Sequence, residues 1–316
     1  MSRSIKLFLP TALAAAMLLS GFCLSGYGTN AGYTEPEEIR VVSAIGVDPS
    51  ENGVTVSLQT VSGGTGSVEV LRAEGDSLTV TFYRLIGDGE KRNELSHCAL
   101  VALGDRLKAD VINELIDLCR ESYDMPDTVL FVSTENAFEL LGLEGALGYD
   151  LVGTMRPEPY RPGLFSKNRL YEIARDVSGE TALPYFYVNE GKFELFGLKL
   201  YSMGGELVML DREEGAIYLM LKGIFTEGLV QFKDADRRAI AAIKKCVTEA
   251  RGVDGGIEIR CTLMAESELS VDDRVALARY LSIRAQELYS ALALRYGLDL
   301  GYDLEIKRIV FEVSER

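Results

Sequence analysis

The chain is poor in the residues from which most metal and redox sites are built. Among its 316 residues there is one histidine, His97, and no tryptophan. Its five cysteines, which show no CxxC or similar ligand spacing, are Cys23, Cys98, Cys119, Cys246 and Cys261. A zinc site would need several imidazoles or paired thiolates. We therefore expect no metal ion and no cofactor, while a disulfide outside the cytoplasm stays open.

Positive charge is also scarce. The chain has 33 basic and 48 acidic side chains, a net charge of −15. Because Arg3 and Lys6 are the only charged residues among the first 34, the rest of the chain carries −17. Such a field repels phosphate backbones and anionic lipid headgroups, so we expect no nucleic-acid partner. Solubility alone is the commoner reason for a high negative charge.

The N-terminal apolar run is too short for a comfortable membrane span. Arg3 and Lys6 precede the run Leu7–Leu19, which predicts an export signal. The sequence is thus divided into four segments: a signal or lipoprotein-type segment (1–28), a glycine-containing tether (29–36), an N-terminal mixed α/β domain (37–190) and a C-terminal α+β domain (191–316).

Cys23 is the candidate lipidation site. Leu19-Ser20-Gly21 supplies most of a bacterial lipobox, but Phe22 places a bulky side chain directly before the cysteine. Either Cys23 receives acyl chains such as palmitate, which would give stable membrane attachment, or a signal peptidase cuts after a small residue such as Gly28. An uncleaved anchor is a third, weaker interpretation.

The N-terminal domain begins with β-rich segments. Ile39–Val47, Val54–Val61 and Val68–Arg72 are expected strands, the first two joined by the turn residues 48–53. Asp76 is placed to cap a helix with Leu78, Phe82, Leu85 and Ile86 on one face.

A strand–helix–strand unit follows. The continuous apolar run Cys98–Leu103 predicts a strand covered on both faces. Behind it come the helix Leu107–Ser122, the strand Thr128–Val132 and a short helix ending near Leu141, with Ser133 or Thr134 as its cap. Connections of this length predict a right-handed parallel crossover.

Residues 142–163 are rich in glycine and proline, which predicts a long irregular loop. Ser166 should cap the next helix, whose inward residues are Leu170, Ile173, Ala174 and Val177. Strands are expected at 185–188 and 193–201, with the domain boundary near the turn residues 189–191.

The C-terminal domain should combine a β-sheet with one long helix. Ser270, Asp273 and Gly297 suit the ends of a helix over Val271–Tyr296, with Ala278, Leu281, Ala285, Leu288 and Leu292 as its apolar stripe. The other expected elements are strands at 206–210, 257–263 and 304–313 and a helix at 213–221. Residues 236–251 fit either a helix or the first strand of a hairpin. The fold class is therefore α+β, with mixed α/β layers.

The role of His97 largely decides between two classes of protein, an enzyme and a non-catalytic protein. A serine hydrolase would have to use it as the base, yet Ser96 is its sequence neighbour and no GxSxG elbow occurs. Because His97 precedes a buried strand, a hydrogen-bonded structural histidine is the favoured interpretation. We expect no catalytic, cofactor-binding or metal-binding residues, and no enzyme.

Several stretches together resemble the Ger(x)C family, the C subunit of bacterial spore germinant receptors. In the family's order they are Glu37-Glu38-Ile39 leading into Ala44-Ile45-Gly46-Val47-Asp48, Ala73-Glu74-Gly75-Asp76-Ser77, Leu95-Ser96-His97 opening a strand that ends in Gly104-Asp105, Phe193–Tyr201, and Arg295-Tyr296-Gly297-Leu298-Asp299. The resemblance covers nearly all of the chain after the signal.

The resemblance implies a non-enzymatic lipoprotein on the outer face of the inner spore membrane, acting beside two integral membrane subunits in nutrient sensing and germination. It also implies a hairpin rather than a helix around Val253–Gly256. Phe22 departs from the family's lipobox, and the last strand region, ending near Val313, is shorter than the family pattern. An exported solute-binding or surface-interaction lipoprotein is the alternative, and an exported hydrolase using His97 a remote one.

Overall fold

A computed structural model describes most of the chain after the tether. The described residues are 39–62, 66–87, 92–122, 124–155, 164, 168–174, 180–202, 205–234, 237–265, 269–298, 300, 302 and 305–314. The export signal, Cys23 and the tether lie outside them. None of the described helices is long and apolar enough to cross a membrane.

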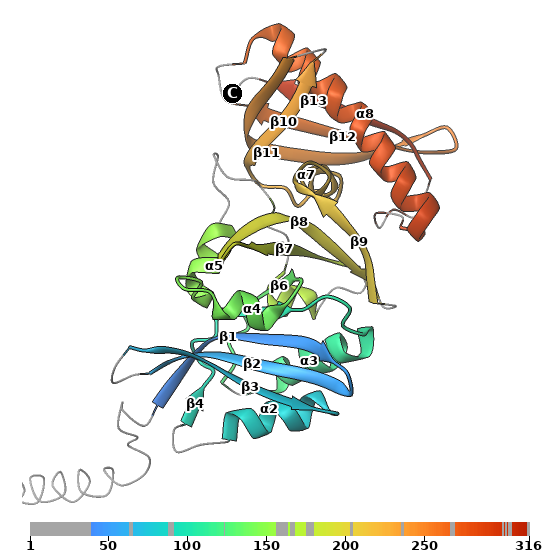
Figure 1. Cartoon of the computed structure of the whole chain (residues 1–316). Coiled ribbons are helices and arrows are strands. Elements are labelled where there is room, and N and C mark those ends of the chain that lie inside the picture. Colours follow the sequence, from blue (N-terminus) through green and yellow to red (C-terminus); the bar gives the residue numbers. More distant parts are fainter. Residues whose placement is uncertain are drawn as a thin grey trace, which may run out of the picture.

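Within the described ranges, the larger sheet has nine strands and a parallel centre between two antiparallel flanks (Figure 1). Its order is β3 (Val68–Gly75), β2 (Gly53–Ser62), β1 (Ile39–Ser50), β5 (Leu100–Leu103), β6 (Leu130–Thr134), β7 (Thr181–Asn189), β8 (Lys192–Ser202) and β9 (Gly205–Asp211), while β4 (Arg92–Glu94) also pairs with β1. The pairs β1–β5, β5–β6 and β6–β7 are parallel. The β5–β6 pairing confirms the predicted parallel strand–helix–strand unit.

Helices cover both faces of the parallel centre. α2 (Leu78–Gly87), α3 (Ala109–Glu121) and α6 (Leu170–Ile173) pack on one face, and α4 (Ala137–Gly142) and α5 (Gly148–Met155) on the other. The side chains of strand β5 alternate between the two faces. Val101 and Leu103 belong to the apolar cluster with α2, α3 and α6, whereas Leu100 and Ala102 belong to the cluster with α4 and α5. All four are fully buried, as the apolar run predicted.

The smaller sheet is built on one long helix, as expected. Its order is β10 (Gly228–Asp234), β11 (Arg237–Val253), β12 (Gly256–Ala265) and β13 (Ile306–Ser314), with α8 (Val271–Tyr296) crossing from β12 to the parallel β13. The backbone N–H of Asp273 donates to Ser270 Oγ at 3.1 Å, and Gly297 ends the helix with φ of 67°. Along the predicted stripe, Leu277 is buried in place of the half-buried Ala278.

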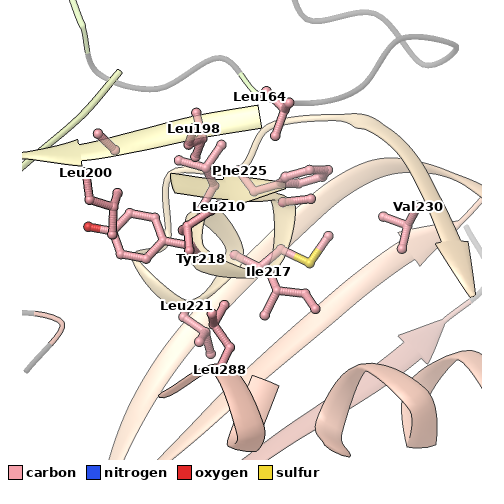
Figure 2. Packing of buried hydrophobic residues seen from close by; sticks show 14 of the residues in the cluster. Leu164, Leu198, Leu200, Leu210, Ile217, Tyr218, Leu221, Phe225, Val230 and Leu288 are labelled. Carbon is pink, nitrogen blue, oxygen red and sulfur yellow. The ribbon is translucent and has the colours of Figure 1, made fainter. Parts of the chain in front are cut away.

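Helix α7 (Arg212–Leu221) joins the two sheets into one core. Every residue from Gly215 to Leu221 is buried, as expected for a helix that is apolar on all sides. Figure 2 shows Leu198 and Leu200 of β8 on one side of this helix and Leu288 of α8 on the other. A single apolar cluster therefore runs from α4 and α5 through α7 to the smaller sheet.

From Arg237 onward the ambiguous segment 236–251 belongs to strand β11, so a helix there is excluded; residue 236 lies outside the described ranges. β11 pairs with β10 on one side and β12 on the other, and turns through Asp254 and Gly255. The helix-like spacing was coincidental: Ile243 is buried, whereas Ile240 and Val247 are 59% and 39% exposed. The hairpin implied by the family resemblance is confirmed.

The predicted irregular loop at 142–163 is wrong at residues 148–155, because Gly148–Met155 forms α5. The buried Gln59 side chain of β2 fixes this segment. Its Nε2 donates to the carbonyls of Leu141 and Ala146, at 2.8 and 2.9 Å, and its Oε1 accepts from Gly148 N at 3.0 Å. Residues 156–163 lie outside the described ranges.

Three predicted helix caps are also wrong. Ser77, not Asp76, caps α2, since its Oγ accepts from Val80 N at 3.4 Å. Asn136 caps α4 in place of Ser133 or Thr134, because β6 continues to Thr134. Helix α6 begins at Leu170 with N-cap Arg169; Ser166 and Val177 lie outside the described residues.

Candidate functional site

His97 lies in an exposed turn just before β5. Its backbone carbonyl accepts a hydrogen bond from Tyr149 Oη at 2.5 Å, which ties the turn to α5. Its imidazole has no hydrogen-bond or ion-pair partner in the part of the chain that the structure describes. The expectation of a hydrogen-bonded structural side chain is therefore wrong: the backbone of His97, and not its ring, holds structure.

A groove of about 660 Å³ opens around this turn, at the amino ends of β5 and β6. Its lining comes from the segments before these two strands, from α5 and from the start of α6: Ser96, His97, Cys98, Ala99, Pro126, Thr128, Leu130, Tyr149, Val152 and Arg169. A backbone bridge between Leu130 and Arg169 fixes the last wall. We call this cavity the amino-edge groove.

The groove contains polar groups of different character. Arg169 Nη1 donates to Tyr171 Oη at 3.3 Å, and no carboxylate among the described residues pairs with the guanidinium. Burial raises the pKa of the Tyr149 phenol, whose hydroxyl donates to the His97 carbonyl. Burial also raises the pKa of the Cys98 thiol to about 12, so Cys98 is a poor nucleophile.

The opposite, carboxyl end of the same strands is occupied by the protein's own charges. Asp48, at the end of the parallel part of β1, accepts from the N–H groups of Ala137 and Phe138 at 2.7 and 2.9 Å. Burial raises the pKa of the Asp48 carboxyl, and these two hydrogen bonds oppose the rise. Gly104 packs so closely that a Cβ there would lie 2.1 Å from Asp48 Oδ1.

A buried ion pair completes this carboxyl end. Lys199 Nζ of β8 lies 2.5 Å from Asp105 Oδ1, and the lysine side chain is 1% exposed against 28% for the aspartate. The ammonium also stands 5.4 Å from the centre of the Tyr185 ring, whose hydroxyl donates to Asp105 Oδ2 at 3.4 Å. Sequence reasoning missed this pair, although a lysine within the apolar run 195–201 was a signal that a partner was needed.

The described residues do not assemble a catalytic group of the kinds considered above. Ser96 Oγ donates to Glu94 Oε1 at 3.0 Å rather than to His97, so no serine–histidine–acid arrangement forms there. Within the same ranges no three histidine, cysteine or acidic side chains cluster as metal ligands. The molecule is therefore an α+β protein with several grooves on its described surface.

Comparison with known proteins identifies the family. Residues 32–187 match the model of the spore germination protein N-terminal domain. The chain is also similar to a solved structure, "Crystal Structure of the GerBC protein", with 11% identity, coverage of 85% of this chain and 96% of that one, and a TM-score of 0.47. That likeness does not by itself establish a shared fold. No curated protein sequence matches.

The chain therefore belongs to the spore germination protein family that carries this N-terminal domain, as its sequence predicted. The matched residues contain β1 to β6 and most of β7. They include both ends of the parallel strands and therefore the whole amino-edge groove.

Proposed function

We propose that this chain is a non-enzymatic, membrane-associated subunit of a nutrient germinant receptor complex, acting in spore germination beside two integral membrane subunits. The observation that carries the proposal is the family match over residues 32–187. The imidazole of His97, which has no partner among the described residues, and the protonated thiol of Cys98 support a role without catalysis.

The proposal places the folded body on the outer face of the inner spore membrane, held by a lipid on Cys23. Two acyl chains on one cysteine give stable attachment, whereas the body's strong negative charge disfavours direct adsorption to anionic lipid. The tether at residues 29–36 would separate the anchor from β1. The boundary between the domains 37–190 and 191–316 stays a prediction; its turn residues 189–191 join β7 to β8.

A deletion strain tests the receptor role. We expect its spores to lose the germination response to at least one nutrient, and the wild-type gene to restore that response. Normal germination with every nutrient, in a strain that also lacks any paralogue, would contradict the proposal.

Metabolic labelling tests the anchor separately. Labelled palmitate should enter the wild-type protein and a Cys98→Ala control, and should be absent from Cys23→Ala. Because Cys98 is buried in the body, its replacement leaves the anchor unchanged. Label that persists in Cys23→Ala would refute lipidation at Cys23, but it would not contradict the proposed receptor role.

A further inference from the structure

We propose that the amino-edge groove binds a small organic anion, a carboxylate or phosphate group on an apolar body, with the Arg169 guanidinium as its charged anchor. The inference concerns the groove alone and does not depend on the chain acting in a receptor complex.

Arg169 has unused hydrogen-bonding capacity. A guanidinium carries five N–H donors in a planar fork that fits a carboxylate or phosphate. Among the described residues, the Arg169 guanidinium forms one hydrogen bond, to Tyr171 Oη. The neighbouring Glu172 forms no direct ion pair with the guanidinium among the described residues: its Oε2 accepts from Arg169 backbone N at 3.1 Å, and its Oε1 accepts from Tyr171 Oη at 3.4 Å.

This state of Arg169 contrasts with other arginines of the same acidic chain. Arg212 pairs with Glu194, Arg260 with Glu258, and Arg284 with Glu213 and Glu287. With 48 acidic against 33 basic side chains, internal carboxylates are plentiful. An arginine that faces a cavity without one therefore has room for an anion from outside.

Apolar and polar groups lie together around the Arg169 guanidinium. Pro126, Leu130 and Val152 supply apolar walls. The imidazole of His97 adds an N–H donor that is unengaged within the described residues. A cavity of several hundred Å³ with apolar walls and a few convergent polar groups is typical of small-molecule sites.

The other large grooves lack this combination. The groove of about 530 Å³ between α7 and β10 holds Arg212 and Glu213, whose charges are already paired with Glu194 and Arg284. The groove of about 390 Å³ beside α3 is lined by no charged side chain among the described residues. Of these three grooves, only the amino-edge groove combines apolar walls with a cation that has no carboxylate partner among the described residues.

Contacts within the protein fix the walls of the amino-edge groove before a ligand arrives. The hydrogen bond from Tyr149 holds the His97 turn, and the backbone bridge to Leu130 holds Arg169. A preformed site loses little conformational entropy on binding.

Calorimetric titration of the purified full-length protein tests the proposal, with benzoate, phenyl phosphate and inorganic phosphate as anionic probes and benzyl alcohol as a neutral isostere. We expect saturable binding of benzoate or phenyl phosphate, weaker by about tenfold or more in Arg169→Gln. Arg169→Lys should lose less, and Arg120→Gln, a surface arginine paired with Asp117, should bind like the wild type.

The preference between benzoate and phenyl phosphate identifies the acid group. Binding of inorganic phosphate alone would overturn the apolar part of the proposal. Equal binding of benzyl alcohol, unchanged affinity in Arg169→Gln, or no saturable binding of any anion up to about 10 mM would overturn it altogether. Thermal unfolding of each variant distinguishes a lost contact from a lost fold, and Arg169→Lys decides the matter if Arg169→Gln does not fold.

Discussion

The two ends of the parallel strands β1, β5 and β6 differ in how they use charge. In open α/β sheets ligands usually bind beyond the carboxyl ends of the strands. Here that end is filled from within: Asp48 holds the start of α4, and Asp105 holds Lys199. At the amino end, Arg169 and His97 face a groove and have no acidic partner among the described residues.

The difference suggests that the two ends of one sheet use charged groups for different purposes, stability at the carboxyl end and ligand binding at the amino end. A charge that is buried and paired depends on its partner, because losing that partner leaves it buried without solvation and destabilises the fold. A charge at a groove adds little to stability and stays available to a ligand.

The largest effect should come from Asp105→Asn. The change removes the Asp105 carboxylate from the Lys199 ammonium, which is 1% exposed, and we expect the free energy of unfolding to fall by about 3 kcal/mol. Lys199→Met should cost less, about 1 kcal/mol, because the 28% exposed Asp105 can be hydrated. Urea unfolding of the purified protein measures both; a larger loss in Lys199→Met would show that Lys199 does not depend on Asp105.

Gly104→Ala should come next. Its Cβ would lie 2.1 Å from Asp48 Oδ1 and 3.2 Å from Asp48 Cα, so rotation of the side chain alone cannot relieve the clash. We expect a loss of about 2 kcal/mol, typical of overpacking. The control is Gly153→Ala in α5, where a Cβ meets nothing within 4 Å and helix propensity favours alanine. Equal melting temperatures of the two variants would contradict the close packing at the carboxyl end.

A smaller, pH-dependent effect is expected for Asp48→Asn. At pH 7 the amide can serve only one of the two N–H groups, which should cost about 1 kcal/mol. Because burial raises the pKa of the Asp48 carboxyl, its protonation favours the folded state. That contribution is complete below the unfolded-state pKa and is lost as pH rises through the folded-state pKa.

The wild type should therefore gain stability relative to Asp48→Asn when the pH is lowered from 7 to about 4. Urea unfolding of both proteins at the two pH values measures this difference, in which the other carboxylates cancel. A difference that is independent of pH, or one that changes in the opposite direction, would show that the Asp48 pKa is not raised by burial.

Local signals explain which parts of the fold the sequence predicted. Ser270, Gly297 and an apolar stripe define α8 within a single segment, and both ends were predicted correctly. The run ending at Leu103 likewise predicted a strand buried on both faces. In 236–251 the spacing fitted two structures, and only pairing with β10 and β12 selects the strand.

The sites depend on contacts that no local pattern contains. Asp105 and Lys199 are 94 residues apart, and Asp48 supports α4 from 89 residues away. The amino-edge groove collects side chains from four separate stretches, so Arg169 carried no signal in the sequence. The apolar run identified the sheet around His97, but only the tertiary structure places His97 beside a cavity.

The smallest effect should be that of His97→Ala. Its exposed ring has no partner within the described ranges, so the free energy of unfolding should change by less than about 0.5 kcal/mol. Tyr149→Phe should cost about 1 kcal/mol, because the phenol is the group that donates to His97 O. Both variants are compared by urea unfolding. If His97→Ala is the more destabilising of the two, the imidazole carries structure after all, and the amino end resembles the carboxyl end in its use of charge.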